Sequence, residues 1–103
     1  MPKAEDAQVL KALGDMTRLR ILGSLNEKPN YISALAAELD LDRTTVAYHL
    51  ALLQSAGLLE SHYEILEEPK SKGKAAHVYS VNMHRLREVL ALPTMRIIRE
   101  NVR

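Results

Sequence analysis

The segment from Asp42 to Gly57 carries the side chains best suited to contact another molecule. It predicts a helix with one apolar stripe, formed by Val46, Leu50 and Leu53. Polar and small residues lie on the rest of its surface, and the candidates for contact are Arg43, Thr44, Thr45, Ala47 and Tyr48. Guanidinium and hydroxyl groups form hydrogen bonds with base edges and phosphates, so the chemistry expected of this face is recognition of DNA.

A second group of polar side chains extends the same expectation. Lys70, Lys72 and Lys74 occupy alternate positions in a predicted loop over residues 67–74. We expect these cations to contact phosphates or a minor groove, although the acidic residues that precede them reduce the local net charge. Gln54 lies on the last turn of the helix before Gly57. We expect it to contact a backbone phosphate or water.

The remaining reactive side chains predict neither a metal site nor catalysis. His49 is expected to be a structural histidine that bonds a neighbouring group. His84 and Glu88 are one helical turn apart, but two ligands are too few to hold a metal. There is no cysteine, which excludes disulfides and thiolate ligands. Because there is also no Gly-rich phosphate loop and no nucleophile near a base, we predict neither an enzyme nor a cofactor.

Helices that position the candidate residues are predicted by periodicity and by capping residues. The first covers residues 4–13, and the second runs from 16 to about 25 behind a capping Asp15. Tyr31 and Ile32 predict a very short strand, and Ser33 is expected to cap the third helix. The fourth is capped by Asp42 and closed by Gly57. Residues 33–57 therefore predict a helix-turn-helix.

The hydrophobic period changes after Gly57. Residues 59–65 alternate between apolar and charged, which predicts a half-buried strand, and residues 76–81 predict a second. Two strands around a lysine-rich loop, directly after a helix-turn-helix, predict a β-wing over residues 58–82. Asn82 is expected to cap a last helix over 83–103 that is kinked near Pro93.

Length and composition predict one intracellular domain over residues 1–103. The chain is 47% hydrophobic with four Tyr and no Phe or Trp, so its core must be aliphatic. The net charge is only +1, so any DNA binding must depend on a few well-placed cations and on dimerisation. No run approaches the roughly 20 apolar residues of a membrane span, and no signal peptide is apparent. We expect a cytoplasmic protein.

Three segments resemble the ArsR-type winged-helix transcriptional regulators. ALGDMTRLRIL over residues 12–22 resembles the family's second-helix signature. TVAYHLALLQSAGLL over 45–59 resembles its recognition helix, and GKAAHVY over 73–79 resembles the return strand of its wing. The chain departs from the family by lacking metal-sensing thiolates, and by having Asp40 and Asp42 where Gly and Ser are common.

The resemblance implies an α+β fold that is mainly helical with a small β-hairpin. It is a winged helix-turn-helix with a three-helix core, a wing, and N- and C-terminal dimerisation helices at 4–13 and 83–103. The implied function is that of a homodimeric regulator, usually a repressor released by a signal, that binds operator DNA.

Apolar residues on the two terminal helices are expected to form the dimer interface, because a domain of this size has little core left to cover them. These residues are Val9, Leu10, Leu13, Leu86, Val89, Leu90, Ile97 and Ile98. Twofold pairing would place two recognition helices about 34 Å apart, which is one turn of DNA, and would require a palindromic operator.

Two functions of different classes remain open. In the first, the chain is a sequence-specific regulator whose partners are double-stranded DNA and a second copy of itself. In the second, it is a winged-helix module for protein–protein interaction in a transcription or chromatin assembly. The second would require a large exposed apolar patch on the outer face of the fourth helix or on the wing. The operator and any small-molecule effector are not predicted.

Overall fold

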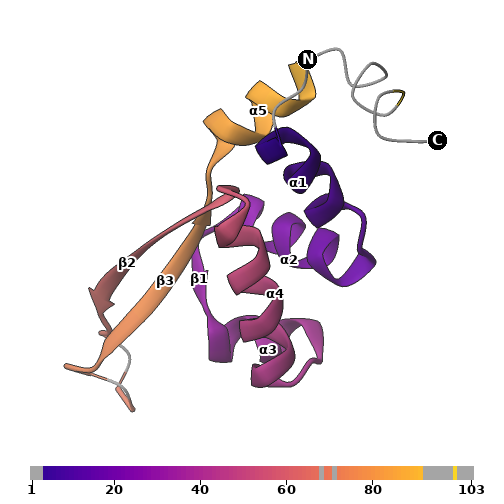
Figure 1. Cartoon of the computed structure of the whole chain (residues 1–103). Coiled ribbons are helices and arrows are strands. Elements are labelled where there is room, and N and C mark those ends of the chain that lie inside the picture. Colours follow the sequence, from indigo (N-terminus) through magenta and orange to yellow (C-terminus); the bar gives the residue numbers. More distant parts are fainter. Residues whose placement is uncertain (1–3, 68, 71, 92–98, 100–103) are drawn as a thin grey trace.

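The computed structural model describes residues 4–67, 69–70, 72–91 and 99. Within them, helices from the first half of the chain pack against a small antiparallel sheet, and a last helix lies beyond the end of its hairpin (Figure 1). In chain order the elements are α1 (Ala4–Leu13), α2 (Met16–Glu27), β1 (Asn30–Tyr31), α3 (Ile32–Leu39), α4 (Arg43–Ser55), β2 (Leu59–Ile65), β3 (Ala75–Val81) and α5 (Met83–Ala91). The α+β winged helix-turn-helix fold predicted from the sequence is confirmed.

The first helix has its predicted bounds, and α2 begins where Asp15 predicts but ends at Glu27, two residues later than expected. Asp15 precedes α2 in an extended conformation, and its Oδ1 accepts a hydrogen bond of 3.0 Å from the Arg18 backbone N–H. This bond satisfies one of the donors that a helix leaves unpaired at its start. The buried face of α2, formed by Ile21, Leu22 and Leu25, then enters the core.

The helix-turn-helix consists of α3, a turn over residues 40–42, and α4. Asp40 has a φ of 56°, and the Leu41 N–H donates to the Ala36 carbonyl over 2.9 Å, so Asp40 adopts the left-handed conformation in which Gly is usual. The prediction that Ser33 caps α3 is wrong, because the helix begins at Ile32 after Tyr31.

The early start of α3 follows from pairing that is distant in sequence. Asn30 lies opposite Tyr79 and Tyr31 opposite Val78, so β1 joins the edge of β3 immediately before the helix begins. The short strand is therefore shifted by one residue from its predicted position, and Ile32 belongs to the helix.

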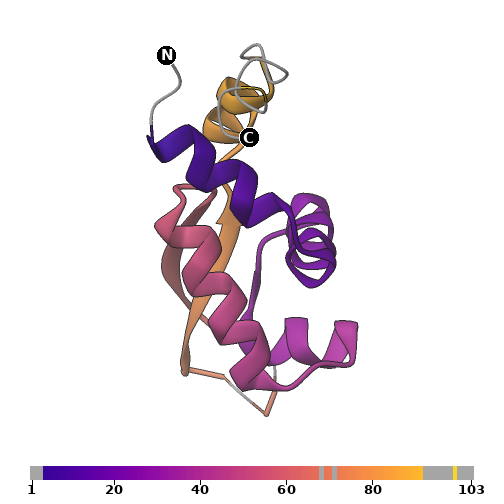
Figure 2. The same cartoon turned by 45° about the vertical axis from the view of Figure 1, so that its right-hand side comes forward.

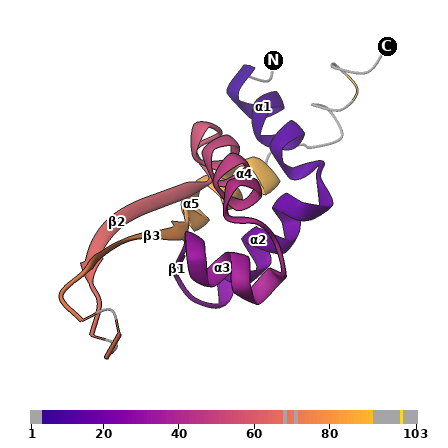
Figure 3. The same cartoon turned by 90° about the horizontal axis from the view of Figure 1, so that it is seen from below.

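The wing is a long hairpin in a sheet of order β1-β3-β2. Its register runs from Leu59 opposite Val81 to Ile65 opposite Ala75. The views in Figures 1 and 3 show the hairpin projecting away from the helices. Its base is buried, but Tyr63 is 72% exposed and Ile65 is 60% exposed. The expectation of a half-buried strand is thus wrong for the outer half of β2, which none of the helices in the described part of the chain covers.

The core is mainly aliphatic, as the composition predicts, and one aromatic side chain, Tyr79, is also buried in it. Its largest fully buried side chains are Ile21, Leu35, Leu50, Leu53, Leu58, Val9, Val46 and Val89. None of the helices in the described ranges is long and apolar enough to cross a membrane.

The structure does not support the expected dimer contacts of Val9 and Val89. Both have no exposed surface in a single protomer, so they pack within it and are not available to a partner. Leu10, Leu13 and Leu86 are only partly buried, and Leu90 is 58% exposed. Ile97, Ile98 and the expected kink at Pro93 lie outside the described residues.

Candidate nucleic-acid interface

The two faces of α4 differ sharply in exposure. Val46, Leu50 and Leu53 are at most 1% exposed, whereas the Tyr48 side chain is 61% exposed. Arg43 and Thr44 are also exposed, and Thr45 and Ala47 are half-buried. Four of the predicted contact residues therefore present surface on or beside the first turns of α4, and Tyr48 follows one turn later. Figure 2 shows α4 running beside the hairpin.

The start of α4 is formed by backbone contacts. Asp42 occupies the N-cap position, and its carbonyl accepts from the Val46 N–H over 3.0 Å. Its exposed carboxylate makes no capping hydrogen bond, which differs from the role predicted for it. The end of the helix that carries Arg43 and Thr44 is thus open to solvent.

The opposite end of α4 is closed by a Schellman motif. Gly57 has a φ of 78°, its N–H donates to the Gln54 carbonyl over 2.9 Å, and the Leu58 N–H donates to the Leu53 carbonyl over 3.0 Å. The side chain of Gln54 donates from Nε2 to Ser61 Oγ over 3.1 Å. Gln54, which was expected to contact a phosphate or water, therefore connects α4 to β2 in the free protein.

A groove of about 570 Å³ separates the start of α4 from the wing. Arg43, Thr44 and Ala47 line one side, and Lys74 and His77 line the other. Tyr31 and Ser33, at the β1–α3 junction, also line it. Two cations, Arg43 and Lys74, thus lie among the residues that line this concave surface.

The wing carries a stack of rings that the sequence analysis did not identify. The Tyr63 and His77 rings lie 4.7 Å apart and 14° from parallel, and the His77 and Tyr79 rings lie 4.5 Å apart. Tyr79 Oη and His77 Nδ1 are at hydrogen-bond distance, 3.2 Å. Burial, followed by the neighbouring Tyr63, raises the pKa of the Tyr79 hydroxyl. Tyr63 lies directly opposite His77, so the signal that could have revealed the stack was the strand register.

The three lysines of the wing are all exposed. The hairpin is closed by hydrogen bonds from the Leu66 N–H to the Lys74 carbonyl, 2.8 Å, and from the Gly73 N–H to the Leu66 carbonyl, 3.0 Å. Lys74 therefore lies where the loop joins β3, close to α4, while Lys70 and Lys72 lie in the loop.

A buried polar contact supports α4 from the side of α1 and α2. His49 is only 9% exposed, and its Nδ1 lies 3.3 Å from an Arg18 guanidinium nitrogen. Arg18 Nε also donates to the Ala12 carbonyl over 2.6 Å. His49 is thus the structural histidine that the sequence predicted. The hydrogen bond from the Arg18 N–H lowers the pKa of Asp15, and the charge of Arg18 acts in the same direction.

The His84–Glu88 pair is present but lies on the surface. His84 Nε2 is 3.9 Å from Glu88 Oε2, the His84 side chain is 91% exposed, and Glu88 also accepts a hydrogen bond from Arg85. Within the described ranges no three His, Cys, Asp or Glu side chains gather closely enough to hold a metal ion.

Comparisons with known proteins agree with this geometry. Residues 13–62 match a family described as a helix-turn-helix domain. The HTH-type transcriptional regulator CmtR of Mycobacterium tuberculosis is 43% identical over 58 residues, which cover 56% of this chain and 49% of CmtR. The chain thus spans about half the length of the first curated relatives that it matches.

Two solved structures extend the similarity to almost the whole chain. An ArsR-like transcriptional regulator from Rhodococcus sp. RHA1 is 33% identical, with a TM-score of 0.71 over 94% of this chain and 82% of that one. A homodimeric winged helix-turn-helix DNA-binding domain from Mycobacterium bovis, a possible ArsR-family regulator, shares the fold at 24% identity. Its TM-score is 0.65, over 96% of this chain and 82% of that one.

The family and the fold are those of transcriptional regulators and not of enzymes. Similarity to the Rhodococcus regulator extends well beyond the helix-turn-helix and includes the wing and the flanking helices. This chain therefore belongs to the ArsR-type winged helix-turn-helix transcriptional regulators.

Proposed function

We propose that the protein represses transcription by binding a specific DNA sequence, with α4 in the major groove. The observation that carries this proposal is the contrast between the two faces of α4. Its buried stripe fixes the helix in the core, while Arg43, Thr44 and Tyr48 are exposed. Arg43 and Thr44 also line the groove of about 570 Å³ between α4 and the wing. Arg can bond guanine or a phosphate, and a short hydroxyl can bond either type of base edge.

The wing is proposed to contact the DNA backbone. Lys74 and Arg43 line opposite sides of the groove, so a phosphate chain lying there would meet a cation from each side. Lys70 and Lys72 are exposed further out along the same hairpin. Flexible lysine side chains suit contacts with phosphates, which provide affinity without selecting a sequence.

The proposed assembly is a homodimer on a palindromic operator. Figure 1 shows α1 and α5 together at the end of the molecule remote from the wing tip. Their partly exposed residues Leu10, Leu13, Leu86 and Leu90 are the apolar surface that a partner would cover. The homodimeric Mycobacterium bovis domain of the same fold supports this arrangement. The cytoplasmic location and the lack of a cofactor remain predictions from the sequence.

The proposal is tested by selecting bound duplexes from a pool of randomised DNA. The expected result is one enriched palindrome, whose binding weakens steeply between about 50 and 200 mM salt. Sedimentation of the free protein at micromolar concentration should give the mass of a dimer. Failure to enrich any sequence would contradict the proposed DNA specificity, and a monomer would contradict the proposed assembly.

A second candidate, a protein-interaction module, is favoured by the exposed apolar surface of the wing. Tyr63 and Ile65 are 72% and 60% exposed and lie on one face of β2. The DNA selection separates the two functions. A protein-interaction module would show at most weak, sequence-independent binding that disappears as salt is raised.

A further inference from the structure

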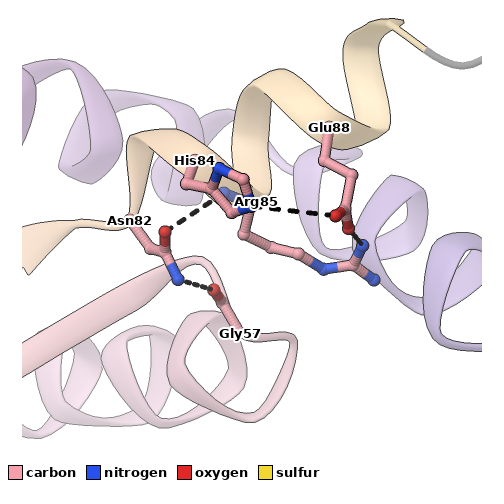
Figure 4. A network of polar contacts seen from close by, with 5 residues as sticks. All are labelled: Gly57, Asn82, His84, Arg85 and Glu88. Carbon is pink, nitrogen blue, oxygen red and sulfur yellow. Dashed lines mark hydrogen bonds and ion pairs between the residues drawn. The ribbon is translucent and has the colours of Figure 1, made fainter.

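The end of α4 and the start of α5 are in direct contact, although the whole wing separates them in sequence. The Asn82 backbone N–H donates to the Leu58 carbonyl over 2.7 Å. The Asn82 side chain donates from Nδ2 to the Gly57 carbonyl over 3.2 Å, as Figure 4 shows. The residue that precedes α5 is therefore bonded to Gly57 and Leu58, in the turn that closes α4.

The same Asn82 side chain also caps α5. Its Oδ1 accepts from the Arg85 N–H over 3.1 Å, and its backbone carbonyl accepts from the Leu86 N–H over 3.1 Å. One primary amide thus bonds the C-terminal end of α4 with its donor and the N-terminal end of α5 with its acceptor. No other side chain type of this size offers both groups in this geometry.

The Arg85 side chain adds a packing contact to this junction. A Cβ atom built on Gly57 would lie 3.8 Å from Arg85 Cγ, so the aliphatic part of Arg85 lies over the glycine. Its guanidinium bonds Glu88 on the same helix, which holds the side chain in this position (Figure 4). The first turn of α5 therefore rests on the end of α4 through both hydrogen bonds and van der Waals contact.

We propose that Asn82 is a positioning residue that fixes the angle between α4 and α5, and thereby determines which half-site spacing the dimer accepts. This inference rests on the proposed function, in which α5 contributes to the dimer interface and α4 enters the DNA. In a twofold dimer, a rotation at this junction moves both recognition helices at once. A rigid junction restricts the protein to one spacing, whereas a loosened junction tolerates several.

The Asn82→Asp variant separates the role of Asn82 in fixing the angle between α4 and α5 from its role as the cap of α5. The carboxylate still accepts from the Arg85 N–H, because Asp and Asn are equally good N-caps. It has no N–H to donate, so the bond to the Gly57 carbonyl is removed and two oxygen atoms face each other instead. The backbone bond from Asn82 to Leu58 does not depend on the side chain, so folding should survive.

The test compares the parent protein, Asn82→Asp and Ile21→Val. The last variant is a matched control that loosens a fully buried core position away from the junction. The probes are the palindrome that the parent enriches, versions of it with the spacer longer or shorter by one base pair, and a duplex with a single half-site. Circular dichroism and sedimentation first establish that each variant is folded and as dimeric as the parent.

The parent should bind its own spacing far better than the altered spacings. In Asn82→Asp this discrimination should fall by about two- to tenfold, the value of one hydrogen bond, while affinity for the single half-site stays within about twofold of the parent. Ile21→Val should keep the discrimination of the parent.

Three results would overturn the inference. Asn82→Asp could keep the full discrimination of the parent, or it could weaken binding to every duplex equally, which would show a structural role only. Ile21→Val could lose discrimination to the same extent, which would show that general destabilisation is the cause. A parent that binds no specific duplex would instead contradict the proposed function, and the inference would fall with it.

Discussion

The two ends of α4 are constructed in opposite ways. At its start, Asp42 caps the helix through its backbone alone, and Arg43 and Thr44 are exposed beside the groove. At its other end, Gly57 closes a Schellman motif, and the Asn82 side chain donates a hydrogen bond to the Gly57 carbonyl. One end of the helix is available to a ligand, while the other is fastened to β2 and α5.

This difference assigns separate tasks to the two ends. Contacts with DNA require side chains that are not already engaged by the protein, and these occur at the open end. Precise placement requires bonds to the rest of the fold, and these occur at the anchored end. Substitutions at the anchored end should therefore change stability or geometry, whereas substitutions at the open end should change affinity for DNA.

The largest effect on stability is expected at Leu53, which is fully buried at the anchored end. Leu53→Ala should lower the free energy of unfolding by about 2–5 kcal/mol, because it leaves a cavity in the core. Urea denaturation measures this change. Leu19→Ala, at a position on α2 that is 43% exposed, is the matched control. Equal losses in the two variants would contradict the packing described for α4.

Replacing Lys70, Lys72 and Lys74 together with Ala tests whether the wing contacts the same DNA as the open end of α4. Removing one interaction with a phosphate should reduce the slope of log affinity against log salt by about 0.9, and specific and nonspecific DNA should be affected alike. Titrations at several salt concentrations measure the slope. Lys28→Ala, at the exposed end of α2, is the control. An unchanged slope in the triple variant would exclude wing contacts with the backbone.

Gly57→Ala should destabilise the anchored end by about 1 kcal/mol, because an alanine is strained at the positive φ of this position. The space is sufficient, so the cost comes from the backbone and not from a clash. Gly23→Ala is the same substitution inside α2, where nothing lies within 4 Å of the added Cβ. It should instead raise the melting temperature, because Ala favours a helix. Opposite shifts in Tm from the two variants are the expected outcome.

The smallest effect is expected from Asp42→Asn at the open end. Stability should change little, because Asn is an equally good N-cap and the native carboxylate makes no capping bond. Affinity for DNA should rise by about two- to fivefold at low salt, since one charge that repels phosphates is removed. Glu60→Gln removes the same charge from β2, near the base of the wing. A gain that is equal in both variants would show that only net charge matters.

Local signals were sufficient to predict most of the helices. Asp15 predicts the start of α2, and Gly57 predicts the end of α4, because each residue type is typical of its end of a helix. The predicted start of α3 is wrong, because the start depends on the pairing of β1 with β3, a strand that is distant in sequence. The burial of Val9 and Val89 also could not be predicted, since periodicity defines an apolar face without identifying what covers it.

For the candidate site too, the sequence predicts the features that lie within one element and not the contacts between elements. The exposed face of α4 follows from its helical period, and the exposed lysines follow from the composition of a loop. The groove between α4 and the wing, the Tyr63–His77 stack and the Asn82–Gly57 bond each join residues from different elements. Such contacts depend on the strand register and on how the elements pack, which a single sequence does not display.

The central claim is that the open end of α4 contacts DNA bases, and the Thr44→Ala, Tyr48→Ala double variant tests it most directly. Both side chains are exposed, so circular dichroism and Tm should stay close to those of the parent. Affinity for the selected palindrome should fall by about 1–3 kcal/mol per half-site, with an altered sequence preference. Ser55→Ala, which is exposed at the anchored end, should bind like the parent. Undiminished affinity in the double variant would contradict the assignment of this face.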